Sequence, residues 1–306
     1  MKSWQRPDYS LISRMMLVLV GIMALDLGFV WFLHRELEWS WWFEAAIGII
    51  VAGVMILGGI VLSPRMFMEQ TCHPLSPEWQ RRVERLAFLA DIPVPTLYTV
   101  SSPIANAFTV RSWTGKGCAI VATTALLNNL TEEEFDAVMA HELAHIAHHD
   151  MIMILVAGSL NLVLSTLMQR WWILGNLMSF RGSGNGANPL GLVMAGMSFT
   201  WLVSTLLIRI FSRQRELAAD ETAAIFLGTP VTLIHALENC DDINRRYIRT
   251  HRLTSSRRSS ILAPDLRLIQ SAQLISFTWS GLSTRSFLSS HPTTKERVAR
   301  LGRYWQ

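Results

Sequence analysis

Charged residues are scarce in this sequence. They make up 16% of its 306 residues, whereas soluble globular domains average about 25%. Hydrophobic residues make up 50% of the chain, and its mean hydropathy is positive. The composition therefore excludes an ordinary soluble protein and indicates a chain that is partly embedded in a membrane.

Cysteine and net charge are also low. The three cysteines, Cys72, Cys118 and Cys240, are odd in number and widely spaced. This pattern predicts reduced thiols and excludes both a disulfide framework and a CxxC metal site. The net charge is only +4 at pH 7, and a basic face beside anionic lipid is enough to explain it. We therefore expect a lipid bilayer as a partner and no nucleic acid.

Long apolar runs are what the sequence contains instead. A helix needs about 20 apolar residues to cross ~30 Å of hydrocarbon. The first run exceeds the apolar core of a cleavable signal, so we interpret it as an anchor. The predicted fold class is a mainly α integral membrane protein with about four transmembrane helices. The four apolar windows are Met15 to Leu33, Phe43 to Ser63, Met151 to Gln169 and Leu190 to Ile208.

Basic residues beside these windows predict the orientation. Three of them precede the first window, and Arg209, Arg213 and Arg215 follow the fourth. The positive-inside rule then places the N-terminus and the parts outside the two membrane hairpins in the cytoplasm. Arg170 and Arg181 argue for the opposite orientation. The predicted organisation is a membrane hairpin, a cytoplasmic part, a second hairpin and a second cytoplasmic part, at residues 1–63, 64–150, 151–208 and 209–306.

The first cytoplasmic part has the pattern of a small α+β domain. Apolar residues at helical spacing predict an amphipathic helix over residues 77–90, with an apolar stripe formed by Val83, Leu86, Phe88 and Leu89. The segments that follow are short, rich in β-branched residues and interrupted by proline and glycine. They are DIPVPTLYTV, NAFTV and CAIVAT, and they predict a sheet of about three strands.

The sequence HELAH lies inside a second predicted helix. Thr131 and Glu134 have the spacing of a capping box, so the helix begins well before the motif. His141 and His145 then project from one face and can bind one cation. Glu142, rotated by about 100°, can reach a water molecule on that cation. Because HExxH also occurs in chains that bind no metal, a third ligand has to support this interpretation.

A carboxylate on a later helix can supply the third ligand. A catalytic zinc takes three protein ligands and keeps one position open. His148 and Met151 stand where another class of HExxH site has Gly and His, so that class is excluded. The helix-forming stretch 212–228 supplies Glu216, with Asp220 one turn further on, where it can hydrogen-bond a ligand histidine. By spacing alone, a solvated acidic face with Glu216 paired to a neighbouring arginine is slightly favoured.

Five segments together resemble one protein family. They are NAF at 106–108, NLTEEEF at 129–135, HELAHIAHHD at 141–150, SRQRELAAD at 212–220 and HPTTKERVARL at 291–301. These segments resemble the HtpX-type membrane zinc endopeptidases, which are relatives of the CaaX prenyl proteases. The resemblance spans about residues 90–230 and 289–302. It is weakest over 241–288, a basic, serine-rich stretch that looks like an insertion.

The resemblance implies a zincin-like (gluzincin) catalytic domain that faces the cytoplasm and is carried on membrane helices. It implies a multi-pass protein of the bacterial inner membrane. Its substrates would be misfolded or damaged membrane proteins and unfolded polypeptides, which the enzyme removes as a form of quality control. It does not predict the oligomeric state.

The resemblance also implies roles for individual residues. One Zn²⁺ per chain would be bound by His141, His145 and Glu216, with Glu142 as the general base. The remaining assignments are a substrate-strand contact for Asn106 and stabilisation of the tetrahedral intermediate by His291 and Arg297. Without the resemblance, a histidine before a proline such as His291 is more typical of a loop. We expect His148 and His149 at the interface where the helix meets the membrane. Asp150 either hydrogen-bonds a metal ligand or is an interfacial acid, and the sequence does not decide between these two roles.

Two other interpretations stay open. A site-two-type intramembrane protease should carry an LDG-like ligand motif in a later membrane helix, and the sequence has none. A non-catalytic membrane scaffold would hold a structural zinc and close its fourth position with a cysteine or histidine. Whether Cys118 or His148 does so is not decided by the sequence.

Overall fold

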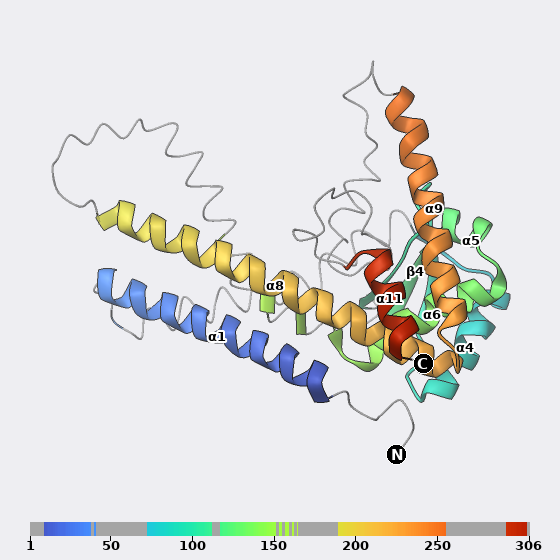
Figure 1. The fold of residues 1–306 in the computed structure, drawn as a ribbon, viewed down its shortest axis with the longest axis horizontal. Helices are drawn as coiled ribbons and strands as arrows, with labels where there is room; N and C mark the ends of the chain where they lie inside the picture. Colours follow the sequence, from blue (N-terminus) through green and yellow to red (C-terminus); the bar gives the residue numbers. More distant parts are fainter. Residues whose placement is uncertain are drawn as a thin grey trace. The chain divides into compact units, whose positions relative to one another are not determined.

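The computed structural model describes residues 9–37, 40, 72–111, 117–150, 153–154, 157–158, 161, 164, 189–254 and 292–304. Within these residues the chain is mostly helical (Figure 1). The second apolar window and most of the third lie outside the described residues, as does most of the 241–288 stretch.

The chain divides into two compact units. The sheet-containing unit consists of Met1–Tyr9, Ile60–Met151 and Arg213–Gln306, and the apolar-helix unit consists of Ser10–Gly59 and Ile152–Ser212. The long helix α8, Pro189–Leu227, contributes residues to both. Each unit has its own hydrophobic core.

Two described helices have the length and composition to cross a membrane. They are α1, Tyr9–Leu37, and α8, and their apolar stretches are Ser13–Phe32 and Val193–Leu227. The first stretch coincides closely with the first window expected from the sequence, and the second contains most of the fourth window but continues past its end at Ile208 to Leu227. That the chain has about four such helices stays a prediction.

The apolar-helix unit has a core between α1 and the first part of α8. Ile22 and Phe211 lie in one buried cluster, and Phe29 and Met197 lie in another. Gly196 permits this approach, because a Cβ atom there would lie 2.7 Å from the ring of Phe32. Other large apolar side chains of α1 are exposed. An apolar surface on such a helix is what contact with lipid requires.

Within the described residues, the sheet has four strands in the order β1-β2-β4-β3. The strands are β1, Cys72–Pro74; β2, Thr96–Val100; β3, Ala107–Arg111; and β4, Cys118–Thr123. β2 and β4 are parallel, and the other two pairs are antiparallel. The sequence predicted about three strands. It missed β1, which is only three residues long and ends in a proline, a residue that cannot donate to a ladder.

Helix α4, Pro77–Ala90, has the bounds that the sequence predicted, but its apolar stripe was partly wrong. Val83, Ala87 and Ala90 form the buried face. Phe88 is 83% exposed and Leu89 is 69% exposed. The physical reason is spacing, because residues 83, 87 and 90 follow the i, i+4, i+7 pattern of one helix face while residue 88 lies about 100° away from residue 87.

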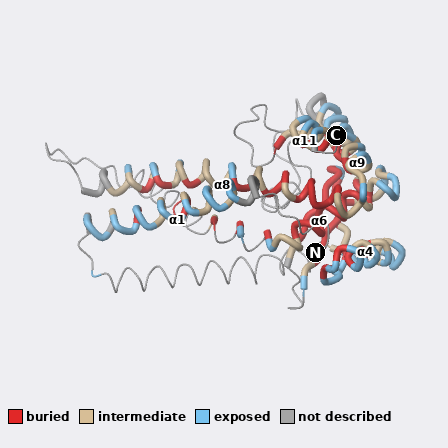
Figure 2. The backbone as a smooth tube through the Cα atoms, turned by 60° about the horizontal axis from the view of Figure 1, so that its bottom comes forward, coloured by how far each residue is buried: buried red, intermediate tan, exposed pale blue. Residues whose placement is uncertain are grey.

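Helix α6, Glu132–Ala147, lies at the centre of the sheet-containing unit. The predicted capping box is present: Thr131 N donates to Glu134 Oε2 at 2.9 Å, and Glu134 N donates to Thr131 Oγ1 at 3.2 Å. From Phe135 to His145 nearly every residue is buried, as Figure 2 shows. A helix that is buried all round is a rigid platform for side chains.

Three further helices lie in the described part of this unit. They are α5, Thr124–Asn129; α9, Val231–Thr254; and α11, Thr294–Tyr304. Leu237 of α9 and Leu301 of α11 belong to the same buried core as Val138 of α6. This core is what places the last part of α8 and the start of α11 beside the HELAH segment.

Candidate metal centre

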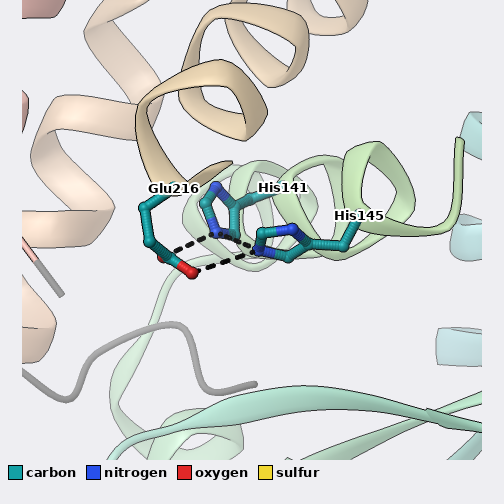
Figure 3. Close-up of side chains that lie close together, drawn as sticks. All are labelled: His141, His145 and Glu216. Atoms are coloured by element: carbon teal, nitrogen blue, oxygen red, sulfur yellow. Dashed lines mark hydrogen bonds and ion pairs between the residues drawn. The ribbon is translucent and has the colours of Figure 1, made fainter. Parts of the chain in front are cut away.

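His141, His145 and Glu216 lie together although 71 residues separate the last two in sequence. His141 Nε2 lies 3.1 Å from His145 Nε2. Glu216 Oε2 lies 3.6 Å from His141 Nε2, and Glu216 Oε1 lies 3.6 Å from His145 Nε2 (Figure 3). The two histidines are four residues apart on α6, so they share one face, and α8 presents Glu216 to that face.

These three residues fit a tetrahedral metal ion. Ligand atoms at about 2.0–2.1 Å from a tetrahedral zinc lie about 3.3 Å apart, and the observed separations of 3.1 and 3.6 Å bracket that value. All three side chains are buried. Two neutral imidazoles and one carboxylate are also a ligand set that zinc accepts in catalytic sites.

The charges around the cluster favour a divalent cation. Among the described residues, four buried carboxylates and two buried guanidinium groups lie in and around it, so in their ionised forms these six side chains carry two net negative charges before the histidines bind a proton or a metal ion. A divalent cation would neutralise them, and burying unbalanced charge costs several kcal/mol or more. The carboxylates are Glu142, Asp150, Glu216 and Asp220, and the guanidinium groups are Arg215 and Arg297.

Asp220 contacts Nδ1 of His141, the ring nitrogen that does not face Glu216. The Nδ1 atom of His141 lies 3.0 Å from Asp220 Oδ1, and Arg297 Nε donates to Asp220 Oδ2 at 2.7 Å. Arg297 Nη2 also lies 3.4 Å from His141 Nδ1. A proton on Nδ1 that is donated to Asp220 leaves the lone pair on Nε2, the atom that faces Glu216.

These contacts shift the pKa values of both partners. Burial alone would lower the pKa of His141, but the hydrogen bonds with Asp220 and Glu216 outweigh it and raise the pKa to about 9. Burial would raise the pKa of Asp220, but the charge and hydrogen bonds of Arg297 hold it below the usual range of a carboxyl group. Asp220 is therefore a permanent anion at neutral pH.

Glu142 is buried beside the cluster and contacts the sheet. Thr109 Oγ1, on β3, donates to Glu142 Oε2 at 2.7 Å. Glu142 Oε1 is buried and makes no hydrogen bond with the part of the chain that the structure describes. Burial raises the pKa of the Glu142 carboxyl, as suits a group that must accept a proton. Thr109 had no predicted role, and its position on a short β-branched strand was the only signal for it in the sequence.

The structure excludes the solvated acidic face that spacing alone favoured. Glu216 is fully buried. Arg213 forms a 2.7 Å ion pair with Glu296, and Arg215 lies 3.1 Å from Asp150. The spacing of Glu216 and its neighbouring arginines in the sequence favoured a solvated glutamate, which is wrong. Spacing along one helix contains no information about the elements that pack around that helix.

The remaining predicted residues have different outcomes. Asn106 is buried just before β3, where its backbone N donates to Thr123 Oγ1 and its backbone carbonyl accepts from the same hydroxyl. The contact of its side chain with substrate stays a prediction. His291 lies outside the described residues. Arg297 is buried and is held by Asp220, as described above. Its effect on a tetrahedral intermediate stays a prediction.

The neighbouring histidines do not join the cluster. His148 Nε2 lies 3.2 Å from Thr222 Oγ1, and His149 is exposed. Among the described residues, the group that can hold a metal consists of His141, His145 and Glu216 alone. Cys118, on β4, is not part of it.

Two buried histidines and a buried glutamate, with a further buried glutamate beside them, define a metallopeptidase type of centre. The family comparison agrees with this class. Residues 75–304 match the model of Peptidase family M48, and the chain therefore belongs to that family. The matched range includes the whole centre.

Similar proteins extend over nearly the full chain. A protein named "Protease HtpX homolog" from Moorella thermoacetica is 31% identical over 315 aligned residues, covering 98% of this chain and 96% of the relative. "Protease HtpX homolog 1" from Streptomyces coelicolor is 32% identical over 315 residues, covering 99% and 95%. The chain is thus a membrane-associated metalloprotease, and the resemblance seen in the sequence is confirmed.

A solved structure is also similar. The crystal structure of Ste24p from S. mikatae aligns with a TM-score of 0.48 and 17% identity. The alignment covers 94% of this chain and 63% of that chain, so this chain spans less than two thirds of that protein.

Proposed function

We propose that this protein is a zinc-dependent endopeptidase with one Zn²⁺ per chain, held by His141, His145 and Glu216. The observation that carries the proposal is the geometry of these three buried side chains, whose ligand atoms all lie within 4.8 Å of one another. A bound zinc ion supplies Lewis-acid polarisation of the scissile carbonyl group and lowers the pKa of a water molecule toward neutrality.

Glu142 acts as the general base in this proposal. Its carboxylate takes the proton from the attacking water and passes it to the leaving amine nitrogen. Thr109 fixes one of its oxygens, which leaves Oε1 for proton transfer. Asp220 keeps the proton of His141 on Nδ1, and Arg297 keeps Asp220 in place. Arg297 and His291 are proposed to stabilise the oxyanion of the tetrahedral intermediate, an effect worth roughly 3 to 4 kcal/mol per preorganised donor.

The substrate would bind as an extended strand along β3. This strand pairs with β4 on one side, and within the described sheet it is an edge strand. Edge strands offer unpaired backbone groups to an extended peptide. β3 also carries Thr109, which contacts Glu142, so a peptide on this edge would lie near the general base. Asn106, which directly precedes β3, is the proposed side-chain contact.

The substrates we propose are misfolded or damaged membrane proteins and unfolded polypeptides, cut at the cytoplasmic surface of a bacterial inner membrane. Two lines of support are the apolar helices α1 and α8 and the basic residues beside the predicted windows. Four transmembrane helices and a gluzincin-like layout of the catalytic domain belong to the same proposal. So does the division into two membrane hairpins and two cytoplasmic parts.

The rival scaffold function has less support. A structural zinc would need a fourth protein ligand. Within the described residues, neither Cys118 nor His148 belongs to the cluster. The site-two alternative is not favoured either, because the family match is to M48.

Cleavage and metal content of the detergent-purified protein test the proposal. The wild type should contain zinc and cut casein, and a chelator should stop cleavage. Glu142→Gln should keep the zinc, since Glu142 is not a ligand, but should lose nearly all activity because the proton acceptor is gone. Near wild-type cleavage by Glu142→Gln would show that the hydrolytic mechanism is wrong.

A further inference from the structure

A second buried chain of contacts lies behind His145. His145 Nδ1 is 2.6 Å from Asp150 Oδ2, and Arg215 Nε is 3.1 Å from the same oxygen. Arg215 Nη2 also approaches His145 Nδ1 to 3.4 Å. All three side chains are buried, where charged contacts are stronger than at a solvated surface.

A reversal of the backbone brings Asp150 to His145. On a straight helix, residues five apart point about 140° away from each other and do not meet. Helix α6 ends at Ala147, and His149 adopts a left-handed conformation with φ 54°. The resulting turn directs Asp150 back toward the ring of His145.

Arg215 connects this carboxylate to the other metal-bearing helix. It directly precedes Glu216 in α8, so its contact with Asp150 ties the backbone that carries Glu216 to the end of α6. Both ligand histidines thus have similar environments, because the Nδ1 atom of each faces a buried carboxylate that is paired with a buried arginine. The two pairs differ in geometry: Arg297 donates hydrogen bonds to Asp220, whereas the contact of Arg215 Nε with Asp150 is an ion pair that lacks hydrogen-bond geometry.

We infer that Asp150 and Arg215 are positioning residues of the metal centre. Asp150 fixes the ring of His145 with its proton on Nδ1, which leaves Nε2 to bind metal. Arg215 holds Asp150 in place and fixes α8 at the residue before Glu216. This role rests on the proposed zinc site. Asp150 and Arg215 act on the binding of the metal ion and do not contact the substrate.

Zinc affinity of the full-length, detergent-purified protein tests this inference, by competition with a chromophoric chelator. Asp150→Asn and Arg215→Gln should each weaken zinc binding by about 10- to 100-fold, the usual loss when a partner of a ligand histidine is removed. Each has a matched control elsewhere in the same unit. Asp136→Asn breaks the ion pair of an α6 carboxylate with Arg82, and Arg213→Gln breaks the pair of an α8 arginine with Glu296.

Two further measurements separate positioning from a purely structural role. In the Co²⁺-substituted protein, Asp150→Asn should change the visible absorption bands, which report ligand geometry, while Asp136→Asn should not. At saturating zinc, Asp150→Asn should leave the KM for a peptide substrate unchanged. Arg215→Lys keeps the buried positive charge and hence the fold, yet it should still lose part of the affinity, because a lysine cannot reproduce the fixed planar geometry of a guanidinium group.

The double variant Asp150→Asn/Arg215→Gln should lose about as much affinity as the weaker-binding single variant, because the two residues act through one contact. Wild-type affinity and spectra in Asp150→Asn and Arg215→Lys would overturn the role of the pair while leaving the zinc site intact. A wild-type protein that binds no zinc would instead overturn the proposed function itself.

Discussion

Thr109 and Glu142 are joined by a 2.7 Å hydrogen bond from the threonine hydroxyl to Oε2 of the glutamate. The contact crosses from strand β3 to helix α6, so an edge strand of the sheet holds the carboxylate that we propose as the general base. Because the proposed substrate strand lies along β3, one element both binds the peptide and orients the base.

Replacement of Thr109 tests this link. Thr109→Val keeps the shape of the side chain but removes the donor. One hydrogen bond to a charged group contributes about 1.5 kcal/mol, so kcat should fall about tenfold while zinc content stays at the wild-type level. Thr109→Ser should restore most of the rate. An unchanged kcat in the valine variant would show that the hydroxyl does not orient Glu142 during the reaction.

His149 is predicted to be a source of strain. It is exposed and has φ 54°, a conformation that costs a residue with a Cβ atom about 1–2 kcal/mol. Glycine adopts it without that cost, so His149→Gly should raise the thermal unfolding midpoint by a few degrees. His149→Ala retains the strain and serves as the control. Neither variant should lose zinc, and a lower midpoint in the glycine variant would contradict the strain.

The thiol of Cys240 should be unreactive toward alkylating reagents in the folded protein. Burial raises the pKa of its thiol to about 12, so the reactive thiolate is absent at neutral pH and the sulfur is not accessible. Iodoacetamide should therefore modify Cys240 only after unfolding, as read by mass spectrometry. Because the unfolded thiol ionises at lower pH, folded-state stability should fall as pH rises from about 9 toward 12. Rapid labelling of Cys240 in native protein would place it outside the core.

The orientation in the membrane has its own test. A reporter fused after Gln306 should behave as cytoplasmic, and a reporter inserted in the segment 181–189 should behave as external, because basic residues follow the fourth apolar window. The opposite pattern would move the peptidase unit to the other side of the membrane and would rule out the proposed access to substrates.

Local signals in the sequence were sufficient for part of the fold and site. The capping residues Thr131 and Glu134 located the start of α6, and the i, i+4 spacing of His141 and His145 then placed both rings on one face. Such features depend on helix geometry alone. The apolar pattern of α1 and α8 was visible for a similar reason.

Long-range packing could not be predicted in the same way. Spacing alone slightly favoured a solvated Glu216, because only the core formed by α6, α9 and α11 shows that this side chain is buried. The sequence left two roles open for Asp150, and its contact with His145 could not be predicted because residues five apart on a straight helix point away from each other. The turn at His149 is what reverses that direction. The exposed Phe88 was assigned to the wrong face because small residues, rather than large ones, form the contact face of α4.

The zinc content of Glu216→Gln measures the central claim most directly. Side-by-side metal analysis of the wild type, Glu216→Gln, Asp220→Asn, His148→Ala and His149→Ala should show about one zinc in the wild type and both histidine variants. Glu216→Gln should lose zinc and cleavage together, because a neutral amide replaces the anionic ligand at 3.6 Å from both histidine nitrogens. Asp220→Asn should be intermediate, with about a 10- to 100-fold loss. Full zinc and activity in Glu216→Gln, with loss in His148→Ala, would contradict the assignment of the third ligand and with it the proposed class of site.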